Sequence, residues 1–449
     1  MLRVGFAIGV ALLLSWSAAA ETSVSAWELP PEGGCASAIL PAKADAPAFE
    51  LRPGDVVGAD RVDSLRGYLP PVIWDNRDRF FFAGMRIEVG PCFGDYSAPA
   101  AFREATEKFR GHSALKDDGG LADHVAGLPF PPDSIARDDP RAGIMWAWNV
   151  ESRWQAGGFR GKFRVIDLVH SEPYEGEIWK RELARRADRP DDGYRVPDTG
   201  TRLWAAGGRF FEPFSARRLA WLQLRDAASN TDARRGDDLY FYMRTTRKVH
   251  DLPSEGIEGV FVPSFSMASQ GGALTPGSGA EAKSAPESRR RAFEGLELRP
   301  LLYSFRVLRT ENVLAPINAM TPAYPADSKR DFGPSGLSWA SDRWDLRRSL
   351  VLEASPHDGG PRSVLWVDLQ TLYPLYFASY DGNGEMLEVG YWVGRFSSAE
   401  RTIEPVGSAF TSLHMSASWR RESWEISSAP EADEDVHRAL SIGNLTKSQ

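Results

Sequence analysis

The seven histidines are the first residues to consider for catalysis or metal binding. No two of them have the i, i+4 spacing by which a pair of histidines on one helix face holds zinc, and the glycine-rich phosphate-binding signatures are missing from the sequence. The histidines are His112, His124, His170, His250, His357, His414 and His437. We therefore predict no catalytic residue, no metal and no cofactor.

Two other patterns come near a catalytic motif. The run from Gly333 to Leu337 resembles a nucleophile elbow, but Leu337 stands where that motif needs glycine, so we interpret Ser335 as a turn residue. Asp75 and Asp78 follow a tryptophan and could serve a glycosidase, which uses two carboxyls. Residues so close together more often make local turn contacts. With the 15 tryptophans, they leave a glycan-binding protein or hydrolase as a third hypothesis.

The first 20 residues have the three parts of a secretory signal peptide. Arg3 is basic, Val4 to Trp16 form a short apolar run, and Ala20 ends a small-residue cleavage site. The run is shorter than the roughly 20 apolar residues that span a bilayer. We predict that residues 1–20 are cleaved and that the protein is exported.

Export has a consequence for the two cysteines, Cys35 and Cys92. In an oxidising compartment such a pair is expected to form a disulfide, which would stabilise the fold by ~4 kcal/mol in the chain-entropy model. Two buried thiols and a metal site are the alternatives, and no C-x-x-C spacing supports the metal.

Composition limits the class of protein. The chain has 449 residues, 42% of them hydrophobic and 25% charged, which is typical of a folded soluble protein. Its 53 basic and 61 acidic residues give a net charge of −8. Because a nucleic-acid partner requires an excess of Lys and Arg, we predict none.

The elements that must position any site are two helices followed by many strands. Helices are predicted from Pro99 to Gly111 and from Pro140 to Gly157, the second with clustered tryptophans that favour buried packing. A strand is predicted from Arg79 to Val89. Further strands are predicted over residues 162–168, 219–225, 239–244, 301–308, 349–354, 364–369, 375–380 and 386–396. The domain bounds that follow are an extended arm over 21–53, a sheet domain over 54–428 with a flexible insert at 266–288, and a polar tail over 429–449.

The last three predicted strands each have one apolar face. Asp381-Gly382-Asn383-Gly384 supplies the positive φ angles of a tight hairpin between two of them. Their apolar faces are interpreted either as an ordinary core or as the concave side of a sheet that shelters an apolar ligand. For the second interpretation the candidate ligand-lining residues are Leu365, Val367, Phe377, Val389, Tyr391 and Val393.

Five short runs occur in an order that resembles a known family. They are Gly84 to Cys92, Ala126 to Pro132, Trp146 to Asn149, Ala206 to Phe210 and Phe332 to Ser338. Between Gly54 and Ser427 the chain resembles domain-of-unknown-function family 1329, exported bacterial proteins described as outer-membrane lipoprotein-sorting-like. The resemblance implies an α+β fold similar to the lipoprotein carriers LolA and LolB: a large, strongly curved antiparallel β-sheet, an unclosed barrel, capped by helices. It also implies a periplasmic setting, with association with the outer membrane left open.

The leading functional hypothesis is a periplasmic, non-enzymatic carrier or chaperone of a lipid or other hydrophobic small molecule. The family resemblance implies an inner-membrane transporter of the resistance-nodulation-division superfamily and an outer-membrane protein as partners. A carrier needs a dry cavity because each CH₂ left in water costs about 0.8 kcal/mol. The alternative is a structural adaptor of an envelope transport complex that binds no small ligand, with an apolar face filled by the chain's own side chains.

Overall fold

The structure is a computed structural model whose described residues are 27–30, 32–33, 52–167, 173–183, 201–217, 219–243, 247–252, 259–263, 297–321, 329–413, 417–428 and 442–446. The predicted signal peptide, Cys35 and the predicted insert 266–288 lie outside these residues. Only short parts of the predicted arm, 21–53, and of the predicted tail, 429–449, are described.

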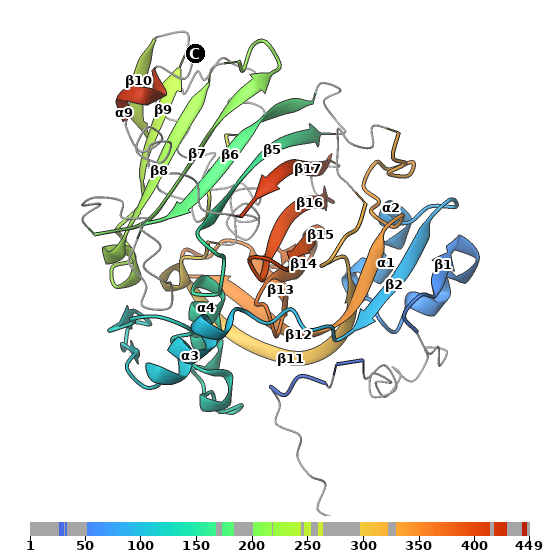
Figure 1. The fold of residues 1–449 in the computed structure, drawn as a ribbon, viewed down its shortest axis with the longest axis horizontal. Coiled ribbons are helices and arrows are strands. Elements are labelled where there is room, and N and C mark those ends of the chain that lie inside the picture. The colour runs from blue at the N-terminus through green and yellow to red at the C-terminus, as the bar shows by residue number, and fades with distance from the viewer. Residues whose placement is uncertain are drawn as a thin grey trace, which may run out of the picture.

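In the described part of the chain, 15 strands form one curved sheet that does not close (Figure 1). The order is β1-β2-β12-β13-β14-β15-β16-β17-β5-β6-β7-β8-β9-β10, with β11 paired to β12. Neighbours are antiparallel except β2 and β12, which run parallel. The strands are β1 (Val56–Gly58), β2 (Arg86–Cys92), β5 (Gly158–Asp167), β6 (Tyr174–Glu182), β7 (Arg202–Glu212), β8 (Ala220–Asp226), β9 (Asp238–Met243), β10 (Lys248–Leu252), β11 (Tyr303–Ala315), β12 (Arg343–Pro356), β13 (Arg362–Asp368), β14 (Pro374–Tyr380), β15 (Met386–Ser397), β16 (Thr402–Ser412) and β17 (Ala417–Ser427). The predicted fold class is confirmed.

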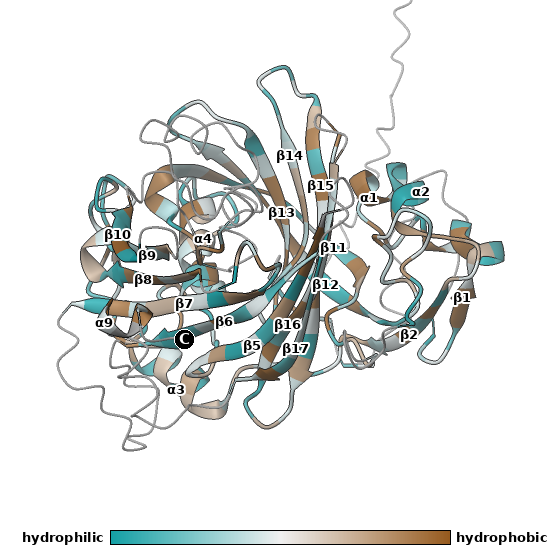
Figure 2. Ribbon diagram, turned by 90° about the horizontal axis from the view of Figure 1, so that it is seen from above, coloured by the Kyte–Doolittle hydropathy of each residue, from teal (hydrophilic) through white to brown (hydrophobic). Residues whose placement is uncertain are grey.

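Strands β5 to β10 follow one another in chain order and form the N-terminal half of the sheet. Apolar and polar residues alternate along many strands (Figure 2), as the period of two requires. On the inner face, Trp204, Phe210 and Trp221 belong to one buried cluster. On the outer face, Leu222 packs with Leu445 of the short helix α9 (Ile442–Leu445). The predicted polar tail therefore includes an apolar contact with the sheet.

Strands β11 to β17 form the C-terminal half, and their side chains belong mainly to one large core. The aromatic rings of Phe377, Trp392 and Phe410 lie 5.2 to 6.1 Å apart on one face. The opposite face is covered from the N-terminal region, where the ring of Phe80 lies 5.3 Å from that of Tyr391. This half is packed on both faces.

The helices are short and few in the described residues. Helices α3 (Ala100–Lys108) and α4 (Ala142–Glu151) confirm the two predicted ones, and the tryptophans of α4 are buried as expected. Helix α4 packs tightly on β11, because a Cβ added at Gly143 would lie 2.2 Å from the carbonyl oxygen of Phe305. Two other short helices, α1 (Pro71–Asp75) and α2 (Arg77–Phe80), precede β2.

The strand predicted from Arg79 to Val89 is wrong in its first part, where α2 occupies residues 77–80 and β2 begins only at Arg86. Burial of Phe80 against Tyr391 outweighs the local β-propensity. Residues 114–115 and 121–122 form a separate two-stranded sheet, β3 (Ala114–Leu115) and β4 (Leu121–Ala122). Within the described residues, we find no helix with the length and hydrophobicity needed to cross a membrane.

Candidate binding cavity

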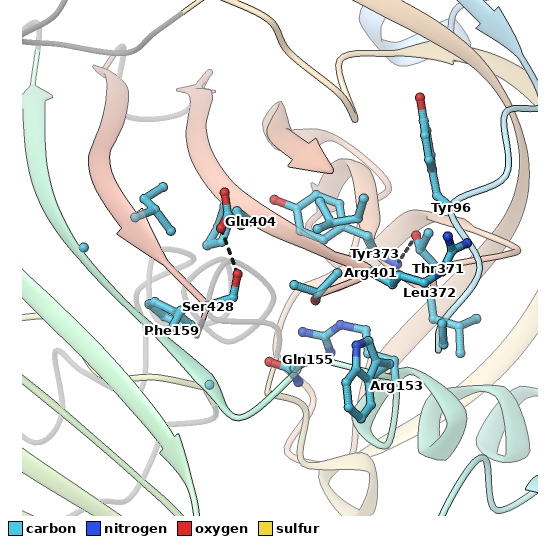
Figure 3. Close-up of a pocket in the computed structure, with 18 of the residues that line it drawn as sticks. Tyr96, Arg153, Gln155, Phe159, Thr371, Leu372, Tyr373, Arg401, Glu404 and Ser428 are labelled. Atoms are coloured by element: carbon cyan, nitrogen blue, oxygen red, sulfur yellow. Dashed lines mark hydrogen bonds between the residues drawn. The ribbon is translucent and has the colours of Figure 1, made fainter. Parts of the chain in front are cut away.

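A cavity lies on the inner face of the sheet, where the N-terminal and C-terminal halves meet (Figure 3). The space between its walls amounts to about 1190 Å³, a volume that includes open solvent at the mouth. The sheet supplies wall residues from β5, β6, β16 and β17. The other walls come from α3, from the segment after α4 and from the turn between β13 and β14.

The segment that joins α4 to β5 brings Arg153, Trp154 and Gln155 to the cavity. The chain then turns sharply at Gly158, whose φ of +125° and close approach to β6 both require glycine. A Cβ at this position would lie 2.1 Å from the carbonyl oxygen of Lys180. Helix α3 adjoins this segment, and the ring centroid of Phe102 in α3 lies 5.7 Å from that of Trp154.

The turn between β13 and β14 is fixed by the buried Asp368. Its carboxylate accepts hydrogen bonds from the backbone N–H and the hydroxyl of Thr371, both at 2.8 Å. It also accepts from Arg347 Nε at 2.8 Å. These contacts hold Thr371, Leu372 and Tyr373 against the cavity.

The cavity wall has an apolar and a polar part. The apolar part includes Phe102, Leu128, Trp154, Phe159, Ile178 and Val260. The polar part includes Arg153, Gln155, Gln370, Arg401, Glu404 and Arg421. In Figure 3, Glu404 and Ser428 lie across the pocket from Tyr96 and Leu372. Such a mixed wall can bury an apolar group and hydrogen-bond a polar one.

Next to the cavity, buried charges on the inner face form an ion-pair hub of Glu151, Lys180, Glu182, Arg225, Asp237 and Glu297. Lys180 Nζ lies 2.6 Å from Glu182 Oε1 and 2.5 Å from Glu297 Oε1. Burial alone would lower the pKa of Lys180, but these two carboxylates outweigh it and raise the pKa. Gln155 Nε2 donates to Glu297 Oε1 at 3.0 Å and so links the hub to the cavity wall.

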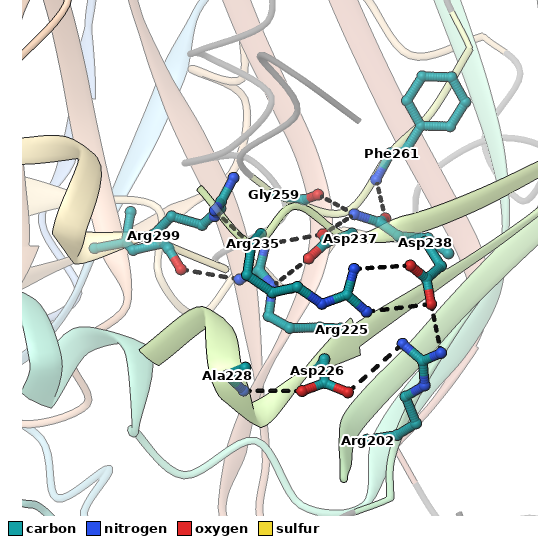
Figure 4. Close-up of polar contacts among 12 residues, drawn as sticks. Arg202, Arg225, Asp226, Ala228, Arg235, Asp237, Asp238, Gly259, Phe261 and Arg299 are labelled. Atoms are coloured by element: carbon teal, nitrogen blue, oxygen red, sulfur yellow. Dashed lines mark hydrogen bonds and ion pairs between the residues drawn. The ribbon is translucent and has the colours of Figure 1, made fainter. Parts of the chain in front are cut away.

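The other part of the hub is centred on Arg225 of β8 (Figure 4). Its guanidinium donates to both carboxylate oxygens of Asp237, at 3.0 and 3.1 Å, and to the carbonyl of Leu298 at 2.9 Å. Burial and the nearby Glu297 raise the pKa of Glu151 well above its usual range, against the attraction of Arg225. The hub thus ties β6 and β8 to the residues around Glu297.

A second polar cluster reaches the cavity through Tyr96. Its ring lines the wall, while its hydroxyl donates to Asp345 and accepts from Asn318 Nδ2 at 2.8 Å. Burial raises the pKa of Asp345 to about 6, although Tyr96 and Arg343 favour the ionised form. Because the Tyr96 hydroxyl is engaged with these partners, we interpret the cluster as a structural support for the wall.

The structure separates the six residues predicted to line a ligand site. Leu365 pairs with Phe377, whereas Tyr376 pairs with Tyr391 and Ala378 pairs with Val389. Paired residues share a face, so Leu365, Val367 and Phe377 lie on the face opposite to Val389, Tyr391 and Val393. The prediction of one continuous apolar face is therefore wrong.

All six residues are at most 3% exposed and belong to the large core. They are not among the described residues that line the cavity. Phe377 shares its face of the sheet with Trp392. Trp392 pairs with Ser408, and Ser408 pairs with Arg421 of β17, so this face continues into the cavity wall. A role of the six in ligand binding stays a prediction.

Other sequence candidates lie away from the cavity or outside the described residues. Asp75 in α1 and Asp78 in α2 are exposed, and Ser335 lies in a turn. Cys92 is buried at the end of β2, and the backbone N–H of Gly33 donates to its carbonyl at 2.9 Å. This contact brings the chain near Cys35 to β2 and supports the Cys35–Cys92 disulfide, which stays a prediction. The described residues hold no group of three His, Cys, Asp or Glu side chains arranged for a metal.

Sequence reasoning missed the residues that form the sheet wall, because β6 and β17 are rich in charged residues and β16 contains Glu404, Pro405 and Gly407. Arg421, Glu404 and Lys180 interrupt the apolar pattern by which strands are found. The alternation in β6, where Tyr174, Gly176 and Ile178 are buried in every second position, could have identified this segment as a strand with one buried face.

Fold and cavity together define a protein built on a curved, unclosed sheet with a partly apolar cavity on its inner face. The chain belongs to the DUF1329 family of proteins of unknown function, whose model matches residues 68–262 and 290–414. The gap between the two matched stretches contains the predicted insert, 266–288. No curated protein matches the chain significantly.

Three solved structures resemble the chain distantly. A domain described as an outer membrane lipoprotein-sorting protein from Vibrio parahaemolyticus has 14% identity and a TM-score of 0.41, covering 69% of this chain and 100% of that one. A DUF1329 family protein from Desulfovibrio piger has 11% identity and a TM-score of 0.40, covering 68% and 100%. A LolA superfamily protein from Nitrosomonas europaea has 13% identity and a TM-score of 0.32, covering 64% and 92%.

Proposed function

We propose that this protein is an exported, non-enzymatic carrier that holds a lipid or other apolar molecule in its cavity. The observation that carries the proposal is the cavity itself, whose wall includes Phe102, Phe159, Ile178 and Val260. Burying an alkyl chain there would gain about 0.8 kcal/mol per CH₂ removed from water. The names of the similar structures, lipoprotein-sorting and LolA superfamily, agree with such a role.

The proposal also names the compartment and the partner proteins of the carrier. A cleaved signal over residues 1–20 would deliver it to the periplasm, and the family resemblance supplies the outer membrane as a neighbour. A transporter of the resistance-nodulation-division superfamily and an outer-membrane protein are its proposed donor and acceptor. Crosslinking in cells followed by identification of the captured membrane protein tests this part.

Ligand binding is tested on protein purified from the periplasm, by solvent extraction with mass spectrometry and by uptake of a fluorescent fatty acyl probe. Ala98 lines the cavity in the loop before α3, and tryptophan at this position would fill the mouth. We expect Ala98→Trp to weaken probe uptake at least tenfold with an unchanged circular dichroism spectrum. Ala101→Trp, on the exposed side of α3, is the matched control and should bind normally. Wild-type protein that carries no molecule and takes up no probe would overturn the proposal.

One observation favours the adaptor as a second candidate. Both faces of β13 to β15 are filled by the chain's own side chains, as an adaptor requires, with Val389, Tyr391 and Val393 at 0% exposure. An adaptor would yield a crosslinked membrane partner together with an empty cavity. Probe uptake that Ala98→Trp abolishes would exclude it as the sole function.

A further inference from the structure

Phe214 is the most exposed large apolar side chain among the described residues, with an exposed fraction of 66%. It lies in the turn between β7 and β8, and the half-buried Phe211 precedes it near the end of β7. Single exposed apolar side chains are common on protein surfaces and need no explanation by themselves. Phe214 differs from the others in the charges that surround it.

The turn that contains Phe214 lies beside the turn between β9 and β10. Ala220, the first residue of β8, pairs with Tyr242 near the end of β9. Lys248, the first residue of β10, pairs with Met243. Both turns therefore lie at the same edge of the sheet, where they can reach one surface together.

These two turns are basic, although the whole chain carries a net charge of −8. In the sequence, residues 213–219 and 243–248 contain five basic residues and no acidic one. The structure describes three of the five, Arg217, Arg247 and Lys248, and all three are exposed. Together with Phe214, these three residues form a surface that we call the basic edge.

Two carboxylates adjoin the basic edge, and each is paired with an arginine. Glu212 forms an ion pair with Arg217, in which 49% and 47% of the two side chains are exposed. Glu175 of β6 is paired in register with Glu212, and its Oε1 lies 3.4 Å from Arg164 Nε. Even when Glu212 is counted against Arg217, the two cations of the turn between β9 and β10 remain.

The opposite ends of the same strands have the reverse charge. The segment that joins β8 to β9, from Asp226 to Asp238, contains four aspartates and two arginines. A charge difference between the two ends of β8 and β9 orients a protein as it approaches a charged surface. The basic edge would therefore meet an anionic surface first.

An aromatic ring among cations fits an anionic lipid surface. Near a bilayer, arginine and lysine meet the head groups, while an exposed aromatic ring enters the boundary between head groups and acyl chains. Arg217 Cζ lies 5.7 Å from the ring centroid of Phe214, so the cation and the ring reach the same surface. A soluble polyanion would use the cations and leave Phe214 in water.

We propose that the basic edge docks this protein on the anionic lipid surface of a membrane. Phe214 enters the boundary between head groups and acyl chains, and Arg217, Arg247 and Lys248 lie against the head groups. The inference depends neither on the cavity nor on the proposed carrier function.

The test measures co-sedimentation of the full-length exported protein with vesicles of phosphatidylcholine alone and of phosphatidylcholine mixed with phosphatidylglycerol. Binding to the mixed vesicles should be at least tenfold tighter, since each basic residue near an anionic surface contributes about a fivefold gain in affinity. Phe214→Ser should weaken that binding about tenfold, because a phenyl ring then no longer leaves water. The double variant Arg247→Asn, Lys248→Gln should weaken it about twentyfold. Asparagine suits the φ of +55° at position 247.

Two variants away from the basic edge are the matched controls. Met320→Ser removes an apolar side chain of 64% exposure in the segment after β11. Arg234→Gln removes a cation whose side chain is 93% exposed in the segment that joins β8 to β9. Both controls should bind the mixed vesicles like wild type. All variants change exposed residues, so their thermal unfolding should match that of wild type.

The outcomes decide the inference separately from the carrier function. Equal binding to both kinds of vesicle, or binding to neither, would overturn it, as would control variants that bind as weakly as the variants of the basic edge. Binding that requires Arg247 and Lys248 but not Phe214 would indicate a soluble polyanion and contradict docking on a membrane. Phe214 is not part of the described cavity wall, so Phe214→Ser should take up the fluorescent fatty acyl probe like wild type.

Discussion

The two halves of the sheet differ in what covers the inner face. In the C-terminal half, Phe377, Trp392 and Phe410 pack against one another at 5.2 to 6.1 Å and no wall of the cavity comes from them in the described residues. In the N-terminal half, the inner face carries Lys180 and Arg225 of the ion-pair hub and opens on the cavity. One continuous sheet is therefore filled along β13 to β15 and borders the cavity where β16, β17, β5 and β6 lie side by side.

The difference follows from what each half receives from the rest of the chain. Tyr391 of the C-terminal half is covered by Phe80, and its hydroxyl donates to the carbonyl of Leu337 at 2.9 Å. Near the cavity, α4 ends at Glu151 and β5 begins at Gly158. Between them no helix covers the sheet, and the side chains of Arg153, Trp154 and Gln155 line the cavity. A sheet keeps a cavity where its covering elements stop short, whatever the hydrophobicity of its strands.

The largest expected effect compares the packed core at β15 with the cavity wall at β16. Val389→Glu places a carboxylate at a site of 0% exposure without a partner, and should lower the free energy of unfolding by about 5 kcal/mol. Ile403→Glu, on the cavity wall, can direct its carboxylate into the cavity and should cost about 1–2 kcal/mol. Urea denaturation measures both. Equal losses would mean that the two regions are packed alike.

A smaller effect tests whether the hub stabilises the N-terminal half of the sheet. Lys180→Met leaves the carboxylates of Glu182 and Glu297 buried without their cation, and should lower the free energy of unfolding by about 3–4 kcal/mol. Lys162→Met, on the outer face of β5, breaks an ion pair with Glu425 whose side chain is 62% exposed, and should cost about 0–1 kcal/mol. Thermal unfolding of the two variants side by side measures the contrast, and similar losses would contradict the structural role of the hub.

The smallest effect concerns the pH dependence of the filled half. The pKa of Asp345 is raised from 3.8 in the unfolded chain to about 6 in the folded protein, so ionisation of this group disfavours folding. Its unfavourable contribution is absent below pH 3.8, grows between pH 3.8 and 6, and amounts to about 2–3 kcal/mol above pH 6. Asp345→Asn should therefore gain stability relative to wild type between pH 4 and pH 7, as measured by denaturant unfolding at both values. A difference that stays constant with pH would show that Asp345 does not titrate in this range.

Local sequence patterns predicted much of the fold. Helices α3 and α4 were predicted because proline and glycine mark their ends, and β12 to β15 because they are β-branched and aromatic with a tight turn at Asp381 to Gly384. The fold class came from the family resemblance and agrees with the sheet. The cavity could not be predicted from the sequence, because Arg421, Glu404 and Gln155 look like ordinary surface residues until strands distant in the sequence bring them together.

The sequence by itself determined which residues within one strand share a face, since side chains alternate along an extended backbone. It could not decide how those faces join across strands, because a shift of one residue in register reverses every side chain. Register placed Phe377 opposite Gly390 and Val389 opposite Ala378, and so divided the predicted apolar face in two. Only the tertiary structure decided where apolar surface became core and where it was left as a partly apolar cavity, because that depends on which distant segments cover each strand.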